Sequence, residues 1–468
     1  MKNITDQILK VVSKEFSVGL KDINLDTGPG DLVKWDSLGS LRLVMSIEKE
    51  FNIQLTIDDI VTVNSIKDLI KVVSNLLNVE EKDLNNKHKF PTLNKITDII
   101  KFPKTVYSGL GSLNSLSSIE IDKVAIILGP SMYAKEIANK VERQLNNIKS
   151  KRFLRNKGEP KEKDIKDLAS RLKKFSPKHI LAIGGGSTID IAKLAWLKYE
   201  QPNYDLGNFD DGIQDFKLRK KASFIAVPTT FGSGSEASSA AAFIRDNEIK
   251  KTILVSHDFL PDYVILDPEL GLSASNLTLF SSAFDALTHA IEGYVSIINK
   301  PILNPIAIMA IKEIFKVLDN IKEQNTDIKF LETLCNAAYY AGIIQNHCSV
   351  GLTHSFAHQL ASYGVSHGVA VAMFLTPVIE FNSNRSEKYT NLIKEIGFKS
   401  INELIDNISA KLNKSKIYPN DKIINKIVKN KSLIIESAMM DITFRTNPIV
   451  PNKSEVETIF DNAIKKII

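Results

Sequence analysis

Four of the eight histidines in this 468-residue chain lie at spacings typical of metal ligands on helices. In FDALTHAIEGY, Asp285 and His289 are four residues apart, so both side chains project from one face of a helix. In LTHSFAHQL, His354 and His358 have the same spacing, and VSHGVA adds His367. Imidazole and carboxylate groups bind divalent transition metals such as iron or zinc. Although a single histidine on a helix is usually structural, this set predicts a metal site.

Two loops rich in small residues follow apolar runs and suggest a second site. HILAIGGGSTIDIAK (179–193) leads from an apolar run through three glycines into a helical pattern. Such glycines let backbone N–H groups approach a phosphate at a helix start, although a plain tight turn fits them equally well. AVPTTFGSGSEASSA (226–240) adds hydroxyl groups after a second apolar run, where α/β sheets bind ligands. The candidate contacts are Gly185, Gly186, Ser187, Thr229, Thr230 and Ser233.

A third signal lies near the N-terminus, in WDSLGSLRLVMSIEKEF (35–51). Ser37 directly precedes an amphipathic helical run. Its simplest role is a helix N-cap. A serine at the positive end of a helix is also well placed to carry a phosphodiester.

Composition narrows the class of protein. The chain is 43% hydrophobic and 24% charged, like an average globular protein. It has no apolar run of roughly 18 residues, no signal-peptide pattern and no basic block interleaved with aromatics. We therefore expect a cytoplasmic protein that binds neither membrane nor nucleic acid. The only cysteines, Cys335 and Cys348, are expected to be free thiols.

The chain reads as a multidomain protein. Residues 1–80 carry a net charge of −3. Residues 1–78 contain three helical patterns. Residues 79–97 lose apolar periodicity and resemble a linker. In 98–270, apolar runs that end in glycine or proline alternate with helical patterns, which predicts a parallel sheet and a Rossmann-like α/β domain. In 271–468 the patterns are helical, and this all-α domain holds the predicted metal ligands.

Residues 98–468 resemble the iron-containing alcohol dehydrogenase family, which has the dehydroquinate synthase-like architecture. The matching segments are FPKTVYSGLGSL, GGGSTIDIAK, PTTFGSGSE, DPEL, FDALTHAIEGY and the HSFAH…SHG pair. The resemblance implies a metal-dependent, NAD(P)-linked alcohol dehydrogenase. It implies that Asp285, His289, His354 and His367 bind Fe²⁺, with Zn²⁺ as the alternative ion, and that His358 is a catalytic proton-relay residue. Lys251 matches a lysine that contacts the cofactor, and the family is often dimeric or larger, so we expect a homo-oligomer.

One departure from this family concerns the cofactor. The family usually has an aspartate after the first strand of the domain, where a carboxylate accepts from the adenine ribose. Here the run ends LGPSMYAK, with Gly129 and Pro130 in that region. A carboxylate favours NAD because it repels a 2′-phosphate. Its absence leaves both NAD and NADP open.

Residues 1–78 resemble an acyl or peptidyl carrier domain, on the match of Asp36, Ser37 and Leu38 followed by LRLVMSIEKEF. The resemblance implies that Ser37 carries 4′-phosphopantetheine. It implies as partners a phosphopantetheinyl transferase, which recognises Asp36, Leu38 and the next helix, and acyl-processing enzymes.

Together these features predict an enzyme that reduces a carbonyl, or oxidises the alcohol, on an intermediate tethered to Ser37. Tethering would raise the effective substrate concentration to about the millimolar range. Two alternatives stay open at this point. In one, the carrier domain is a docking module and the enzyme acts on a free alcohol; in the other, the catalytic part is a non-redox metal-dependent lyase of related fold.

Overall fold

The computed structural model describes residues 2–467 except 30, 33, 36, 54, 56–62, 78–98, 146–147, 208, 210–212, 247, 249–250 and 322–326. The chain divides into two compact units. One comprises Met1–Ile100 with Phe209–Gln214, and the other Lys101–Asn208 with Asp215–Ile468. The expected linker, 79–97, lies outside the described residues, as does Asp36.

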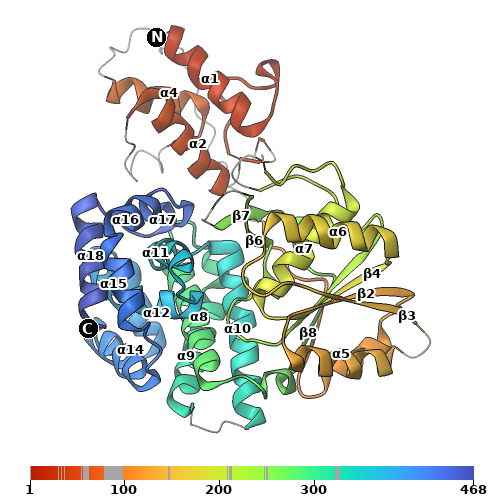
Figure 1. Cartoon of the computed structure of the whole chain (residues 1–468). Helices are drawn as coiled ribbons and strands as arrows, with labels where there is room; N and C mark the ends of the chain where they lie inside the picture. Colours follow the sequence, from red (N-terminus) through yellow and green to blue (C-terminus); the bar gives the residue numbers. More distant parts are fainter. Residues whose placement is uncertain are drawn as a thin grey trace. The chain divides into compact units, whose positions relative to one another are not determined.

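The N-terminal unit contains the three helices that the sequence predicts: α1 (Lys2–Phe16), α2 (Ser37–Phe51) and α4 (Ile66–Leu76), with a short 3-10 turn η1 (Leu20–Asp22) between the first two (Figure 1). Their apolar stripes meet in one core that includes Ile8, Val12, Ile47 and Leu69. Helix α4 starts as predicted, because the Ser65 side chain accepts a hydrogen bond from the backbone N–H of Asp68.

The second unit contains a six-stranded, fully parallel sheet in the order β1-β8-β5-β4-β2-β3. The strands are β1 (Thr105–Ser108), β2 (Lys123–Leu128), β3 (Lys149–Leu154), β4 (His179–Gly184), β5 (Ser223–Pro228) and β8 (Tyr263–Leu266). A separate antiparallel pair, β6 (Ala240–Ile244) and β7 (Lys251–Val255), completes the β-structure of the described residues. The predicted parallel α/β domain is therefore present.

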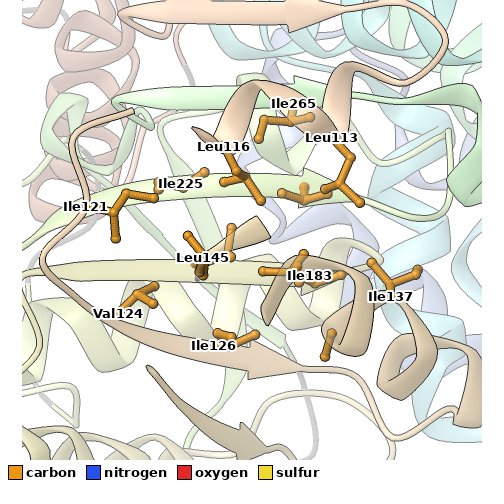
Figure 2. Close-up of a cluster of buried hydrophobic side chains, with 14 of the residues drawn as sticks. Leu113, Leu116, Ile121, Val124, Ile126, Ile137, Leu145, Ile183, Ile225 and Ile265 are labelled. Carbon is orange, nitrogen blue, oxygen red and sulfur yellow. The ribbon is translucent and has the colours of Figure 1, made fainter. Parts of the chain in front are cut away.

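Helices cover both faces of this sheet. Figure 1 shows α5 (Met132–Gln144) over one face, and α6 (Glu162–Phe175) and α7 (Gly186–Glu200) over the other. Alternate residues of β2 point to opposite faces, so Val124 and Ile126 pack with Ile137 of α5 and with the 3-10 helix η2 (Ser112–Ser118) (Figure 2). Strands buried on both faces read as continuous apolar runs, which is why β2, β4, β5 and β8 were predictable.

Strands β1, β3, β6 and β7 carry weaker signals and were not predicted. Strand β3, at one edge of the sheet, has the sequence KSKRFL, in which only Phe153 is buried. An edge strand needs little apolar surface, and its charges discourage pairing with other chains. Pairing with β2, rather than hydrophobicity, places this segment in the sheet.

Beyond residue 275 the regular secondary structure of the described residues is helical, as predicted. The helices are α8 (Asn276–Val295), α9 (Asn304–Asn320), α10 (Ile328–Cys348), α11 (Leu352–Leu360), α12 (His367–Ser383), α13 (Glu387–Ile396), α14 (Ile401–Ser415), α15 (Asp421–Lys429), α16 (Lys431–Met439), α17 (Ile442–Thr446) and α18 (Lys453–Lys465). Short 3-10 turns η3 to η7 join elements of this unit at 235–237, 257–259, 268–271, 301–303 and 361–363. None of the helices in the described ranges combines the length and apolarity needed to cross a membrane. Cys335 and Cys348 are free and buried.

Candidate metal centre and cofactor loops

Three helices bring the four predicted metal ligands to one point. Asp285 and His289 lie one turn apart on α8, His354 lies in the first turn of α11, and His367 is the first residue of α12. The Nε2 atoms of His289 and His354 are both 3.7 Å from Asp285 Oδ1, and that of His367 is 3.4 Å from it. One ligand atom from each of the four residues lies within 4.8 Å of all the others.

This geometry fits a bound divalent ion. Ligand atoms about 2.1 Å from a tetrahedral centre lie roughly 3.4 Å from one another, close to the three distances from Asp285 Oδ1. Asp285 Oδ1 and His354 Nε2 are both buried without a hydrogen-bond partner. Buried polar atoms normally have such partners, so the convergence of these two fits the binding of a cation. Three imidazoles and one carboxylate are ligands that suit iron or zinc.

Glu292 is a functional residue that the sequence reasoning missed. It follows His289 by three residues on α8, and its carboxylate accepts from His354 Nδ1 at 2.7 Å. The same carboxylate accepts from the backbone N–H groups of Gly351 and Thr353, both at 2.7 Å, at the start of α11. It therefore holds the helix and fixes the imidazole with Nε2 directed toward the centre. The i+7 spacing of Glu292 from Asp285 was the available signal.

The electrostatics of the centre follow from burial and close opposite charges. Burial alone would raise the pKa of Asp285, but His289, His367 and His354 together hold it well below its usual range. Burial lowers the pKa of His289 to about 4, and it also lowers the pKa of His367. Burial opposes a charge on His354, but the nearby carboxylates of Asp285 and Glu292 outweigh it and raise this pKa to about 9. The carboxylate is ionised and two imidazoles are neutral, which are the forms that bind metal.

His358 belongs to a separate pair beside the ligands. Its Nδ1 lies 2.9 Å from Asp441 Oδ2, and its ring stacks on that of His367 at a centroid distance of 5.7 Å. Burial opposes the charge on Asp441, but His358 and the bonds from Thr443 lower its pKa. An ionised Asp441 favours the tautomer with the proton on Nδ1, which leaves His358 Nε2 to exchange a proton. Asp441, more than 80 residues away in the sequence, was not predicted.

Two glycines let the helices and loops approach closely enough to form the centre. A Cβ on Gly368, directly after His367, would lie 2.2 Å from the backbone oxygen of Ser281 in α8. A Cβ on Gly232 would lie 2.7 Å from the Cα of Ser282. The first contact brings α12 against α8, and the second brings the loop after β5 against α8. Any larger side chain at these positions would force the backbones apart.

The two predicted cofactor loops pack against each other at the carboxyl ends of β4 and β5. Cβ atoms on Gly185 and Gly186 would lie 2.7 Å from Thr230 Oγ1 and 2.6 Å from Ser233 Oγ. The backbone N–H of Thr229 donates to the oxygen of Gly184, the last residue of β4. The structure therefore brings these predicted residues together, with Ser187 in the first turn of α7. The first N–H groups of that turn have no partner within the helix, which is the arrangement that favours an anion at a helix N-terminus.

A buried lysine from α7 supports the second loop. Lys193 Nζ donates to the backbone oxygens of Ser235, Ser238 and Ala240 at 2.7, 2.6 and 3.1 Å. Burial lowers the pKa of Lys193 to about 8. The neighbouring Asp190 accepts from the Ser235 hydroxyl. Because Lys193 and Asp190 belong to the helix that follows the glycines, this helix sets the positions of both loops.

Lys251, at the start of β7, extends the cofactor region toward the metal centre. Its Nζ lies 2.9 Å from Glu159 Oε1, and the Ser187 hydroxyl donates to Glu159 Oε2 at 3.5 Å. Its charge also contributes to the lowered pKa of His367. By contrast, Asp267 of the DPEL segment has a structural role, because it accepts from the N–H groups of Gly111 and Leu113.

In the N-terminal unit, α2 begins at Ser37, so this serine is the first helical residue and not the N-cap before the helix. Trp35 anchors the preceding residues: it is buried, stacks on Phe16 at 4.9 Å and donates from Nε1 to Ser40 Oγ. A Cβ on Gly39 would lie 2.1 Å from the backbone oxygen of Lys34. The glycine and the tryptophan together hold the start of α2 close to the segment before it.

Comparison with known proteins agrees with this arrangement. Residues 103–268 match the model of the iron-containing alcohol dehydrogenase family, and residues 279–464 match its C-terminal domain. The chain belongs to the iron-containing alcohol dehydrogenase family. A relative in this family, the NADPH-dependent butanol dehydrogenase of Clostridium saccharobutylicum, is 33% identical over 77% of this chain and 96% of its own length.

Other comparisons match only part of this chain or only part of the relative. The aldehyde-alcohol dehydrogenase 2 of Entamoeba histolytica is 32% identical over 60% of this chain, which covers only 33% of that protein. The iron-containing alcohol dehydrogenase of Thermococcus thioreducens is similar in structure, with a TM-score of 0.71 and 26% identity over 78% of this chain and all of that one. Residues 6–73 match the model named phosphopantetheine attachment site. An iron-containing alcohol dehydrogenase and a carrier domain therefore share one chain.

Proposed function

We propose that this iron-containing alcohol dehydrogenase uses NAD(P) to reduce a carbonyl, or to oxidise the alcohol, on an intermediate tethered through phosphopantetheine to Ser37. The observation that carries the proposal is that the attachment domain and the dehydrogenase are fused in one chain. A short tether makes delivery effectively intramolecular. We further propose that a phosphopantetheinyl transferase and acyl-processing enzymes act on residues 1–78.

The residues of the candidate centre suit this chemistry. An ion held by Asp285, His289, His354 and His367 would supply Lewis acidity toward a carbonyl oxygen, and a nicotinamide would supply or accept hydride. Glu292 accepts a hydrogen bond from His354 Nδ1, which directs Nε2 toward the centre.

His358 is the proton donor in the direction of reduction. Asp441 holds its Nδ1, so that its Nε2 can give a proton to the developing alkoxide or take one from the alcohol. The side chain of His358 is 13% exposed, which leaves a route for the proton to be replaced from solvent.

The loops that hold Gly186, Thr229 and Ser233 would bind the cofactor phosphates. Two observations support a nicotinamide dinucleotide here. The loops lie at the carboxyl ends of neighbouring parallel strands, where such folds bind nucleotides. A relative matched over 96% of its length is named as NADPH-dependent.

The test compares tethered and free substrates on the full chain. Mass spectrometry after treatment with a phosphopantetheinyl transferase and coenzyme A should show one added arm, which Ser37→Ala abolishes. The carrier is then loaded with candidate acyl groups, and nicotinamide oxidation is followed for each. In Ser37→Ala, turnover of a tethered substrate should disappear while that of a free small aldehyde is unchanged. Equal loss of both activities, or an arm that never attaches, argues against delivery by the carrier and favours a docking module.

A further inference from the structure

An arginine that follows strand β3 lies beside the end of β2, where a carboxylate would select NAD. In dinucleotide-binding sheets, the strand beside the glycine-loop strand ends near the adenine ribose, and an acidic residue there binds the 2′-hydroxyl. Here the glycine loop follows β4, and its neighbour β2 is followed by Gly129, which has no side chain. The next strand, β3, pairs with β2 in parallel, with Leu154 opposite Leu128. Arg155 therefore follows β3 at the level of Gly129.

The guanidinium of Arg155 reaches across the end of β2 to the glycine-loop helix. Its Nε donates to Thr188 Oγ1 at 3.0 Å, and Thr188 lies in the first turn of α7. A Cβ on Gly129 would lie 3.3 Å from the same Thr188 oxygen. The Thr188 hydroxyl thus marks the point where residue 129, Arg155 and the start of α7 meet.

Two of the three guanidinium nitrogens of Arg155 are engaged, and the third is available. Nη1 donates to the backbone oxygens of Asn156 at 3.0 Å and Gly158 at 2.6 Å, which fixes the turn after β3. Nη2 makes no hydrogen bond with any residue that the structure describes, and the side chain is only half-buried. A fixed arginine with the N–H groups of Nη2 available can donate to a phosphate oxygen.

The carboxylates that act on Arg155 have other partners. The largest attraction comes from Glu159, which pairs with Lys251 at 2.9 Å. Asp164 accepts a hydrogen bond from the side chain of Asn156 at 2.8 Å. Asp190 is engaged by the Ser235 hydroxyl and by the backbone N–H of Ala242. The first turn of α7 adds its own favourable field for an anion.

We infer that Arg155 binds the 2′-phosphate of the cofactor and that this enzyme prefers NADP(H) to NAD(H). The inference rests on the proposed nicotinamide cofactor and deepens it. Arg155 selects the cofactor and takes no part in hydride transfer, because it lies at the adenosine end of the site.

The test uses fragments that differ only in the 2′-phosphate. Calorimetry on the full chain compares adenosine 2′,5′-bisphosphate with 5′-AMP, and no catalytic turnover is needed. The wild type should bind the bisphosphate about tenfold or more tightly, as expected for a charged hydrogen bond to phosphate. Arg155→Gln should remove this preference while the affinity for 5′-AMP changes by less than about twofold.

Matched variants separate the charge from other effects. Arg152→Gln is the control, because this arginine, three residues earlier in β3, pairs instead with Glu142 and Asn139 of α5. It should keep the wild-type preference. Because Arg155 also holds its turn, Gly129→Asp provides a second test with Arg155 intact, and Gly129→Ala controls for its bulk. The aspartate should reverse the preference toward 5′-AMP and NADH, and the alanine should not.

Each contrary result has a distinct meaning. Equal binding of the two fragments by the wild type, or an unchanged preference in Arg155→Gln, overturns the role of Arg155. A preference for 5′-AMP in the wild type would instead assign Glu159 to the ribose hydroxyl. If neither fragment nor NADPH nor NADH binds, the proposed nicotinamide function itself fails.

Discussion

Glu292 determines how one metal ligand is presented, although it lies outside the ligand set. Its two oxygens take three hydrogen bonds, one from His354 and two from the start of α11. A carboxylate can accept all three, whereas an amide must turn an NH₂ group toward at least one donor.

We therefore expect Glu292→Gln to weaken metal affinity about 10- to 100-fold. Competition with a chelator, followed by measurement of bound metal, gives the affinity. Glu380→Gln is the control, because Glu380 pairs with Lys466 at the surface. Full retention of metal affinity by Glu292→Gln would show that the carboxylate does not orient His354.

His354 and His358 lie one helical turn apart, and replacing each with alanine should impair the enzyme in a different way. His354→Ala removes a ligand and should leave the purified protein depleted of metal. His358→Ala should keep its metal but lose about 10²- to 10⁴-fold in kcat, since only the positioned proton donor is removed. Metal analysis and steady-state kinetics on the same preparations check both expectations. Loss of metal from His358→Ala would make His358 a ligand rather than a proton donor.

At the scale of elements, the loop after β5 carries a buried acid that makes stability depend on pH. Glu236 lies in η3 (Ser235–Ala237), and burial raises its pKa to about 7, against the opposing charge of Lys193. The folded state therefore holds this proton more tightly than the unfolded state. The resulting stabilisation is fully present below about pH 4.5 and is lost as the pH rises through about 7.

Between pH 5 and 8, the free energy of unfolding should therefore fall less in Glu236→Gln than in the wild type, by up to about 3 kcal/mol. Denaturant unfolding at several pH values measures it. Glu332→Gln provides a control on α10 outside the buried cluster. An identical slope in wild type and Glu236→Gln would contradict the assignment of the raised pKa to this carboxyl group.

At the scale of the whole molecule, the metal centre joins three helices and should link metal binding to folding. An ion that binds only the folded state stabilises it by about 2.7 kcal/mol at 100 times the dissociation constant. Adding Fe²⁺ or Zn²⁺ to chelator-treated protein should raise Tm, and Asp285→Ala should abolish this shift. A shift that survives in Asp285→Ala would locate the stabilising ion elsewhere.

The sequence alone determined the local elements and the residue types of the site. Continuous apolar runs marked β2, β4, β5 and β8, because these strands are buried on both faces. Helical spacing placed Asp285 with His289, and His354 with His358, because residues four apart share a helix face. The start of α2 at Ser37 followed from the same kind of local pattern.

Only the tertiary structure decided which distant residues meet. Glu292 with His354, Asp441 with His358 and Arg155 with Thr188 are each formed between separate elements, and no local pattern pairs them. Strand β3 likewise could be recognised only from its pairing with β2 in the structure. Short-range periodicity reports which face of an element is buried, whereas the partner across that face depends on how the chain packs.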